Sequence, residues 1–413
     1  SALDSINSEL EEMGEIQGAG KAMILRKITL PLVLPAILSA VILTFSKAIG
    51  TFGTINYLGS PVQYYTLSSQ LYMNINSRDT QTGFAMAILM IIIASIAVFV
   101  NQKLIGSRKS YATIGGKGGR STLIGLGKVG RPVITAALFV FFAVGIIMPI
   151  VILVMESFML KEGIYSLDNF TLHYWIGESN PQIMEGLPGI FKNDEFINSL
   201  FNSLRLTLVN GVFGTIFGQL LGYITAKGRG RLHGKLVEQL VFIPYLIPSV
   251  AFGGIYLSMF SQPQQIFGVT LVPALYGTFA LLTLVSVVKH LPFAARAGTS
   301  NMLQISGELE EAATIEGAGF FRRFVKIVFP LSKGGFISGF MLIFVSIMKE
   351  LDLIILIMTP TTSTLPYLAF RYQNGNSPQA SDCVAIVMFS IVFLVYAIAN
   401  LSGKADLAKS MAG

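Results

Sequence analysis

The chain has 413 residues, of which 53% are hydrophobic and only 12% charged, and its mean hydropathy is +0.66. A soluble domain carries about 25% charged residues, so this composition excludes an ordinary soluble protein and indicates an all-α polytopic membrane protein. The net charge of +7 does not indicate a nucleic-acid partner, because cytoplasmic loops of membrane proteins are enriched in Lys and Arg. The single cysteine, Cys383, excludes an internal disulfide and a cluster of thiolate metal ligands.

Eight segments of the chain are long and apolar enough to be predicted as transmembrane helices. About 20 apolar residues cross the hydrocarbon core of a bilayer. In chain order the predicted spans are 30–49, 83–104, 132–155, 204–226, 236–261, 271–288, 331–358 and 383–401.

A basic linker, 106–131, separates two predicted domains, 1–105 and 132–413. Its glycine-rich segment lacks the spacing of a phosphate-binding loop, so we interpret it as a flexible cytoplasmic joint. The segments 227–235 and 289–326 are also basic, whereas the loop 156–195 carries seven acidic residues against two lysines. The basic segments are therefore predicted to be cytoplasmic and the acidic loop to lie outside.

One polar segment occurs twice in the chain, at an offset of 299 residues. Residues 6–32 and 305–331 align without a gap, and 13 of the 27 positions are identical. Both copies fall on the predicted cytoplasmic side, and each directly precedes a predicted span. A repeat of this kind indicates two related halves on one chain.

The second copy predicts two short helices joined by a glycine turn. Glu308 begins an acidic helix, Gly317 can adopt the positive φ that ends a helix, and Arg322 begins the next helix. An ordinary solvated loop would explain one such segment. The repetition favours a docking surface that offers paired carboxylates.

The second copy resembles the signature loop of the membrane subunits of bacterial ABC importers, Glu-Ala-Ala-x3-Gly-x9-Ile-x-Leu-Pro. The positions that fill this pattern are Glu311, Ala312, Ala313, Gly317, Ile327 and Pro330, with Phe329 where leucine is usual. The first copy keeps Glu12, Gly18, Ile28, Leu30 and Pro31, and has Met13-Gly14 in place of the two alanines.

The resemblance implies the type I importer permease fold, in which each signature loop is a coupling helix seated on one subunit of a cytoplasmic ATPase dimer. Closure of that dimer by ATP would turn the spans between inward-open and outward-open states. Glu311 and Glu12 would pair with basic residues of the ATPase, and Met13-Gly14 would loosen the fit at the first loop. The full predicted coupling surface comprises Glu310, Glu311, Ala312, Ala313, Gly317, Pro330, Glu11, Glu12, Gly18 and Pro31.

The resemblance also implies partners, location and cargo. The chain would have no catalytic or metal-binding residues and no cofactor of its own, since ATP and magnesium would act in the partner ATPase. It would cross the bacterial inner membrane in contact with lipid and receive its solute from a periplasmic or lipid-anchored binding protein, with no nucleic acid. The fused two-half arrangement resembles the ferric-iron permeases, with thiamine, polyamine, phosphonate and sulfate permeases as alternatives. Each half of that family has six spans, so we expect four helices before the first copy that this sequence lacks.

Charges within predicted spans are costly and mark candidate solute contacts. These are Lys47 in the first span and Lys349, Glu350 and Asp352 late in the seventh. Carboxylate oxygens suit a ferric cargo, whereas lysines suit an anion. The alternatives are internal ion pairs or side chains that reach back to the interface.

Two other classes of protein compete with an importer permease. A secondary transporter can also contain repeats, but both copies here face the same side, which makes the repeat parallel. A membrane enzyme would need convergent catalytic groups, and the three histidines, His173, His233 and His290, are scattered along the sequence.

Overall fold

The structure, a computed structural model, describes residues 8–106 and 127–401. Contacts divide it into two units, one made of residues up to 49 with 92–150, and the other of 50–91 with residues from 151 onward. Most of the predicted linker 106–131 lies outside the described residues, and its last residues form the start of a helix.

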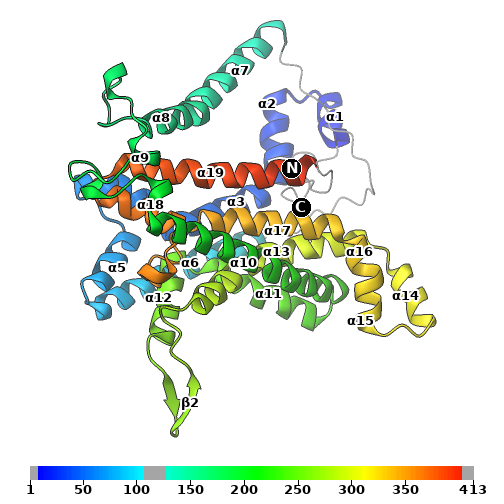
Figure 1. Ribbon diagram of the computed structural model, residues 1–413. Helices are drawn as coiled ribbons and strands as arrows, with labels where there is room; N and C mark the ends of the chain where they lie inside the picture. Colours follow the sequence, from blue (N-terminus) through cyan, green and yellow to red (C-terminus); the bar gives the residue numbers. More distant parts are fainter. Residues whose placement is uncertain (1–7, 107–126, 402–413) are drawn as a thin grey trace. The chain divides into compact units, whose positions relative to one another are not determined.

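The described chain is almost entirely helical (Figure 1). Its first part contains α1 (Ser8–Ile16), α2 (Lys21–Ile24), α3 (Leu30–Gly50), α4 (Gly53–Gly59), α5 (Leu67–Asn76), α6 (Thr80–Gly106), α7 (Gly127–Phe142), α8 (Met148–Glu156) and α9 (His173–Ile176). The remainder contains α10 (Asp194–Lys227), α11 (Leu232–Leu246), α12 (Ser249–Phe260), α13 (Phe279–Gln304), α14 (Gly307–Ile315), α15 (Phe320–Arg323), α16 (Phe329–Leu331), α17 (Lys333–Met348), α18 (Leu365–Asn374) and α19 (Pro378–Leu401). Single turns of π-helix cover Leu25–Thr29, Ala143–Ile147 and Phe324–Val328.

Five helices of the described residues are long and apolar enough to cross a membrane, and two bent pairs raise this number to seven. The five are 80–100, 127–156, 194–227, 279–303 and 378–401, and the pairs are 232–246 with 249–260 and 320–331 with 333–348. The eighth span that the sequence predicts, 30–49, corresponds to α3, which is not among these seven. Its 21 residues extend about 31 Å at 1.5 Å per residue.

The predicted single span 236–261 is wrong in shape, because the chain bends by 98° between α11 and α12. Ile247 and Pro248 lie at the break in extended conformations (ψ of 128° and 138°). A proline disfavours helical backbone in the residue before it and cannot continue the hydrogen-bond ladder. Pro248 therefore produces a break where the hydropathy shows one continuous segment.

Two other predicted boundaries are also wrong. The segment 271–288 begins as the strand β2 (Val269–Val272), and its helix, α13, runs instead from Phe279 to Gln304. The predicted span 331–358 ends at Met348, after which the chain forms buried turns. Between the first two predicted spans, the segment 51–82 contains α4 and α5.

The only strands in the described chain form the hairpin β1 (Gln264–Ile266) and β2, which projects beyond the end of α12 (Figure 1). Its turn uses positive φ at Phe267 (51°) and Gly268 (78°). Two consecutive residues of positive φ match the right-handed twist of a two-residue hairpin.

Glycines allow α10, α13 and α17 to lie side by side (Figure 1). A Cβ at Gly218 would lie 2.3 Å from the Cβ of Ala294, and one at Gly222 would lie 2.4 Å from the backbone of Gly298, both on α13. One at Gly211 would lie 2.6 Å from the Phe340 ring on α17. In lipid there is no hydrophobic drive for helix association, so membrane helices associate through close packing. Small residues permit this close approach.

A second cluster joins α18 and α19 to the segment 174–197. Tyr372 is buried there, and its hydroxyl accepts a hydrogen bond from Asn193 Nδ2 at 3.0 Å. Burial raises the pKa of Tyr372 to about 12, so the phenol stays neutral in this apolar setting. Cys383 is fully buried in the same cluster and occupies the place of a small apolar side chain.

Candidate functional site

The second copy of the repeat folds into a helix, a glycine turn and a second helix. The Ser306 side chain accepts a hydrogen bond from the Glu308 backbone N–H at 3.3 Å and caps α14. Gly317 has a φ of 76°, which ends the helix, and the chain continues through α15 and a π-turn into α16 and α17. The Arg323 guanidinium donates to Thr314 Oγ1 at 2.7 Å and so links the two arms of the loop.

The first copy has the same local structure at the same offset. The bounds of α1, α2 and the π-turn 25–29 are each 299 residues before those of α14, α15 and the π-turn 324–328. Gly18 has a φ of 82°. The turn hydrogen bonds also recur, from Gly18 N to Glu15 O at 2.9 Å and from Gly317 N to Thr314 O at 3.0 Å. We call residues 8–31 and 307–330 the first and second coupling loops, after the role that the resemblance implies for them.

Most of the predicted coupling residues are exposed. In the second loop these are Glu311, Ala312, Gly317 and Pro330, with Ala313 half-buried, and in the first loop they are Glu12, Gly18 and Pro31. Ile16 and Ile315 occupy equivalent positions at the ends of α1 and α14, and each is 85% exposed. Each loop therefore presents a carboxylate and an unburied isoleucine.

Glu310 and Glu11 differ from the adjacent glutamates because their carboxylates bind other side chains of this chain. Glu310 is 7% exposed, accepts a hydrogen bond from Tyr223 Oη at 2.6 Å and pairs with Lys227 Nζ at 2.7 Å. Glu11 accepts a hydrogen bond from Thr29 Oγ1 at 2.5 Å. The sequence groups all four glutamates on one surface, whereas the structure turns these two inward.

The sequence analysis did not predict that Tyr223 and Lys227 contact Glu310 on α14. Tyr223 also packs edge-on against Phe320 and Phe324 on the second arm of the loop, with ring centroids 5.7 and 5.8 Å away. Their spacing of four residues on one helix face was the available signal. The C-terminal end of α10 thus contacts both arms of the second coupling loop.

The predicted pathway carboxylates both lie just after α17 and both have partners. The Glu350 carboxylate accepts from the Leu353 backbone N–H at 2.9 Å and lies 3.5 Å from His290 Nε2. Asp352 Oδ1 accepts from the Gly53 backbone N–H at 2.9 Å. Lys349 beside them is exposed. Lys47 belongs to α3 in the other unit and is also exposed.

His290 and Lys289 are brought to this region because α13 continues past the predicted end of its span. His290 Nδ1 lies 2.9 Å from the Ser286 carbonyl oxygen, an acceptor, so this nitrogen carries the hydrogen. Lys289 Nζ donates to the carbonyl oxygens of Pro244, at 2.9 Å, and Ile247. Nothing in the sequence indicated these contacts, since the three histidines are scattered along it.

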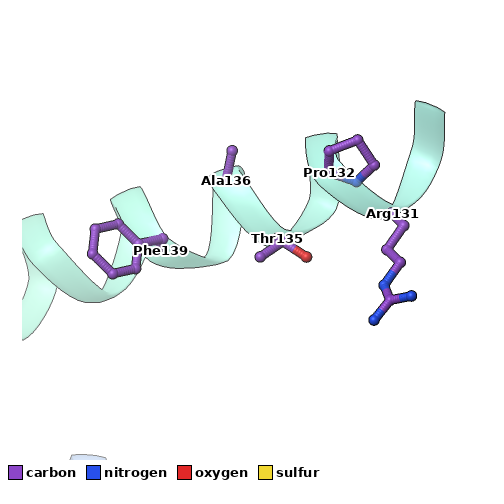
Figure 2. A pocket seen from close by; sticks show the side chains of 5 residues that line it. All are labelled: Arg131, Pro132, Thr135, Ala136 and Phe139. Carbon is purple, nitrogen blue, oxygen red and sulfur yellow. The ribbon is translucent and has the colours of Figure 1, made fainter. Parts of the chain in front are cut away.

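No metal centre marks a site in the described part of the chain. No three His, Cys, Asp or Glu side chains there converge on a position that could hold a metal ion. One pocket is lined by Arg131, Pro132, Thr135, Ala136 and Phe139, which all belong to α7 (Figure 2). It is an open groove along one exposed helix, with no converging polar groups, and it is not a candidate solute site.

Residues 1–111 and 214–405 match the family described as the binding-protein-dependent transport system inner membrane component. The chain belongs to this family. It is accordingly a multi-pass protein of the inner membrane, and the prediction of an importer permease family is confirmed. In such systems ATP hydrolysis belongs to a separate subunit.

Several relatives of this chain are named for the solutes they carry. The ferric transport system permease protein FbpB of Actinobacillus pleuropneumoniae is 22% identical over 420 residues, covering 100% of this chain and 57% of that protein. The putative ferric transport system permease protein FbpB 1 of Haemophilus influenzae is 23% identical, covering 93% and 57%. The sulfate transport system permease protein CysT of Synechocystis is 26% identical, covering 49% and 71%. The chain spans a little over half the length of the two ferric permeases.

A solved structure confirms the predicted fold class. A bacterial ABC transporter involved in the import of the acidic polysaccharide alginate superposes with a TM-score of 0.52 at 16% identity, covering 65% of this chain and 94% of that one. The fold is that of a type I ABC importer permease, and the two β-strands of the hairpin are an addition to the all-α prediction.

Proposed function

We propose that this chain is the transmembrane permease subunit of an ATP-driven importer and that its two coupling loops each dock on one subunit of a cytoplasmic ATPase dimer. The observation that carries the proposal is the repetition of one loop conformation, with the same helix bounds and the same positive-φ glycine, at an offset of 299 residues. Two equivalent docking points match a partner that consists of two equivalent subunits.

The loops are built to transmit a displacement into the membrane. The first loop passes through a π-turn directly into α3, and the second passes through the equivalent π-turn into α16 and α17. At the second loop, the contacts of Glu310, Tyr223 and Lys227 add a connection to α10. A movement of the ATPase surface would therefore act on two helices at once.

The other components follow from this role. ATP and magnesium would bind to the ATPase, and the solute would arrive from a binding protein on the outer side. Ferric iron is the proposed cargo, because the relatives named as ferric permeases match nearly the whole chain, whereas the sulfate permease matches about half of it. The carboxylates of Glu350 and Asp352 are oxygen ligands of the kind that hard cations prefer.

The decisive experiment uses Glu311→Lys in the complete transport system. Reversing an exposed charge at the docking surface replaces attraction to a basic ATPase side chain by repulsion. We expect loss of ATPase co-purification and loss of ATP-dependent uptake of radiolabelled ferric iron. Asp168→Lys is the matched control, because Asp168 is an exposed acid in the loop 156–195, far from both coupling loops in the sequence.

The outcomes separate the role from the cargo. Unchanged uptake with the ATPase still bound to the Glu311→Lys variant would show that the docking role is wrong. Uptake of sulfate or molybdate instead of ferric iron by the unmodified system, lost in the same variant, would contradict only the cargo.

A further inference from the structure

One hydrogen bond joins two positions that are equivalent in the repeat. The Gly53 backbone N–H donates to Asp352 Oδ1 at 2.9 Å, and the two residues are 299 positions apart, which is the offset of the coupling loops. Both residues belong to the same structural unit.

The same offset holds in the local backbone around this contact. Asn56 N donates to Phe52 O at 2.8 Å, and the equivalent Ile355 N donates to Leu351 O at 2.9 Å. The segments 50–56 and 349–355 are therefore equivalent pieces of the two halves, and they touch each other at the same position in each. In a two-fold arrangement only residues beside the axis contact their own equivalents. The contact between Gly53 and Asp352 thus marks the internal two-fold axis.

This contact lies at the ends of the spans that are remote from the coupling loops. Along the chain, α3 leads from the first loop to Gly53, and α17 leads from the second loop to Asp352. A path shared by two related halves lies on the axis that relates them. The segments 50–56 and 349–355 meet on that axis.

The packing at the contact leaves no open space. A Cβ at Gly53 would lie 3.0 Å from Leu351 Cδ2 and 3.6 Å from Asp352 Oδ1. Phe52 beside it is fully buried, and its ring packs against Phe370 with centroids 5.5 Å apart. In this state the side chains of Asp352 and Leu351 lie against the Gly53 backbone and close the axis there.

The two equivalent residues differ in a way that suits a closing contact. Two aspartates facing each other on the axis would repel, because like charges interact strongly in a low dielectric. Two glycines would offer a donor without an acceptor. One glycine and one aspartate give a single hydrogen bond that holds the two segments together. This bond can break without separating an ion pair.

We propose that Gly53 and Asp352 form a gate on the internal two-fold axis, which closes the solute path at the end remote from the coupling loops and parts in each transport cycle. The gate rests on the proposed importer function. Asp352 acts as the latch of this gate, and Gly53 supplies both the donor and the space for close approach.

A reversible cross-link tests whether the contact parts. The variant combines Gly53→Cys and Asp352→Cys in a Cys383→Ser background, which removes the only native cysteine. It is assembled with its ATPase and binding protein in vesicles, and uptake is measured after oxidation with copper–phenanthroline and again after reduction. We expect the disulfide to form, uptake to fall to background while the ATPase stays bound, and reduction to restore uptake.

The matched control is the pair Ser199→Cys and Ser363→Cys, whose hydroxyl oxygens lie 3.0 Å apart and buried within the second half. Cross-linking there should leave uptake unchanged, because both residues belong to one half and move together. Normal uptake by the oxidised Gly53–Asp352 pair overturns the gate, and so does failure of that disulfide to form. If both the reduced variant and the unmodified chain showed no ATP-dependent uptake and bound no ATPase, the importer function itself would be overturned.

Discussion

Two adjacent glutamates on one short helix take opposite roles. Successive residues on an α-helix point about 100° apart, so Glu311 faces solvent while Glu310 faces α10. The sequence placed both on the docking surface, because the spacing alone does not tell which side of α14 meets the protein. That choice depends on Tyr223 and Lys227, which are more than eighty residues away in the chain.

At this scale we predict that Glu310→Gln uncouples transport without releasing the ATPase. The amide keeps an acceptor for Tyr223 Oη but loses the charge that attracts Lys227, whose side chain is 38% exposed, so the lost pair contributes only about 1 kcal/mol. Solute imported per ATP hydrolysed should fall several-fold in reconstituted vesicles, while ATPase co-purification stays normal. Lys227→Arg, which keeps the charge, should retain the ratio. An unchanged ratio in Glu310→Gln would mean that this contact transmits nothing.

Among the elements, the predicted spans 83–104 and 383–401 match the structure best. Each has a continuous, uncharged apolar centre, and they correspond to α6 and α19. Two errors, the single span 236–261 and the predicted end of the next span at residue 288, are linked. The break after α11 frees the carbonyl oxygens of Pro244 and Ile247, and Lys289 on α13 donates to both. A lysine with such partners can lie inside a membrane helix, whereas hydropathy reads it as the end of the span.

The close packing of α10 on α13 was also absent from the sequence analysis, because a glycine shows its use only when its neighbour is known. Gly222→Ala should lower the free energy of unfolding by about 1–3 kcal/mol, since its Cβ would meet the backbone of Gly298 at 2.4 Å and backbone cannot give way cheaply. Thermal denaturation of the purified protein in detergent measures the effect. Gly145→Ala is the control, as nothing lies within 4 Å of a Cβ there. Equal melting temperatures for the two variants would refute the packing argument.

Across the whole molecule, the repeat extends further than sequence identity shows. Identity is clear only for residues 6–32, yet α5 and α18 have the same length and begin 298 residues apart. The helices α6 and α19 also begin 298 residues apart. The one-residue change in offset falls between Asn56 and Leu67. The duplicated loop predicted the two-half architecture, and the later helices of each half kept their shape while their side chains diverged.

The two coupling loops nevertheless differ in sequence, with Met13 and Gly14 where the second loop has Ala312 and Ala313. Only one of these two differences lies on the loop surface. Gly14 is buried, and a Cβ there would meet Ile28 Cδ1 at 3.1 Å and Ile24 Cγ1 at 3.2 Å, so it belongs to the interior of the first loop. Met13 is 57% exposed where the second loop has Ala312. The looser fit predicted for the first loop therefore concerns Met13 alone.

We predict that Met13→Ala strengthens the first docking point. A long, mobile side chain loses rotamer entropy of about 1 kcal/mol when a partner covers it, and alanine loses none. In the Glu311→Lys background, where the second point is disabled, Met13→Ala should raise the retained ATPase about fivefold, which corresponds to about 1 kcal/mol. Quantitative co-purification measures the gain. Gly14→Ala in the same background should change little, because that position faces Ile24 and Ile28. A gain from Gly14→Ala without one from Met13→Ala would place the difference between the loops in their internal packing.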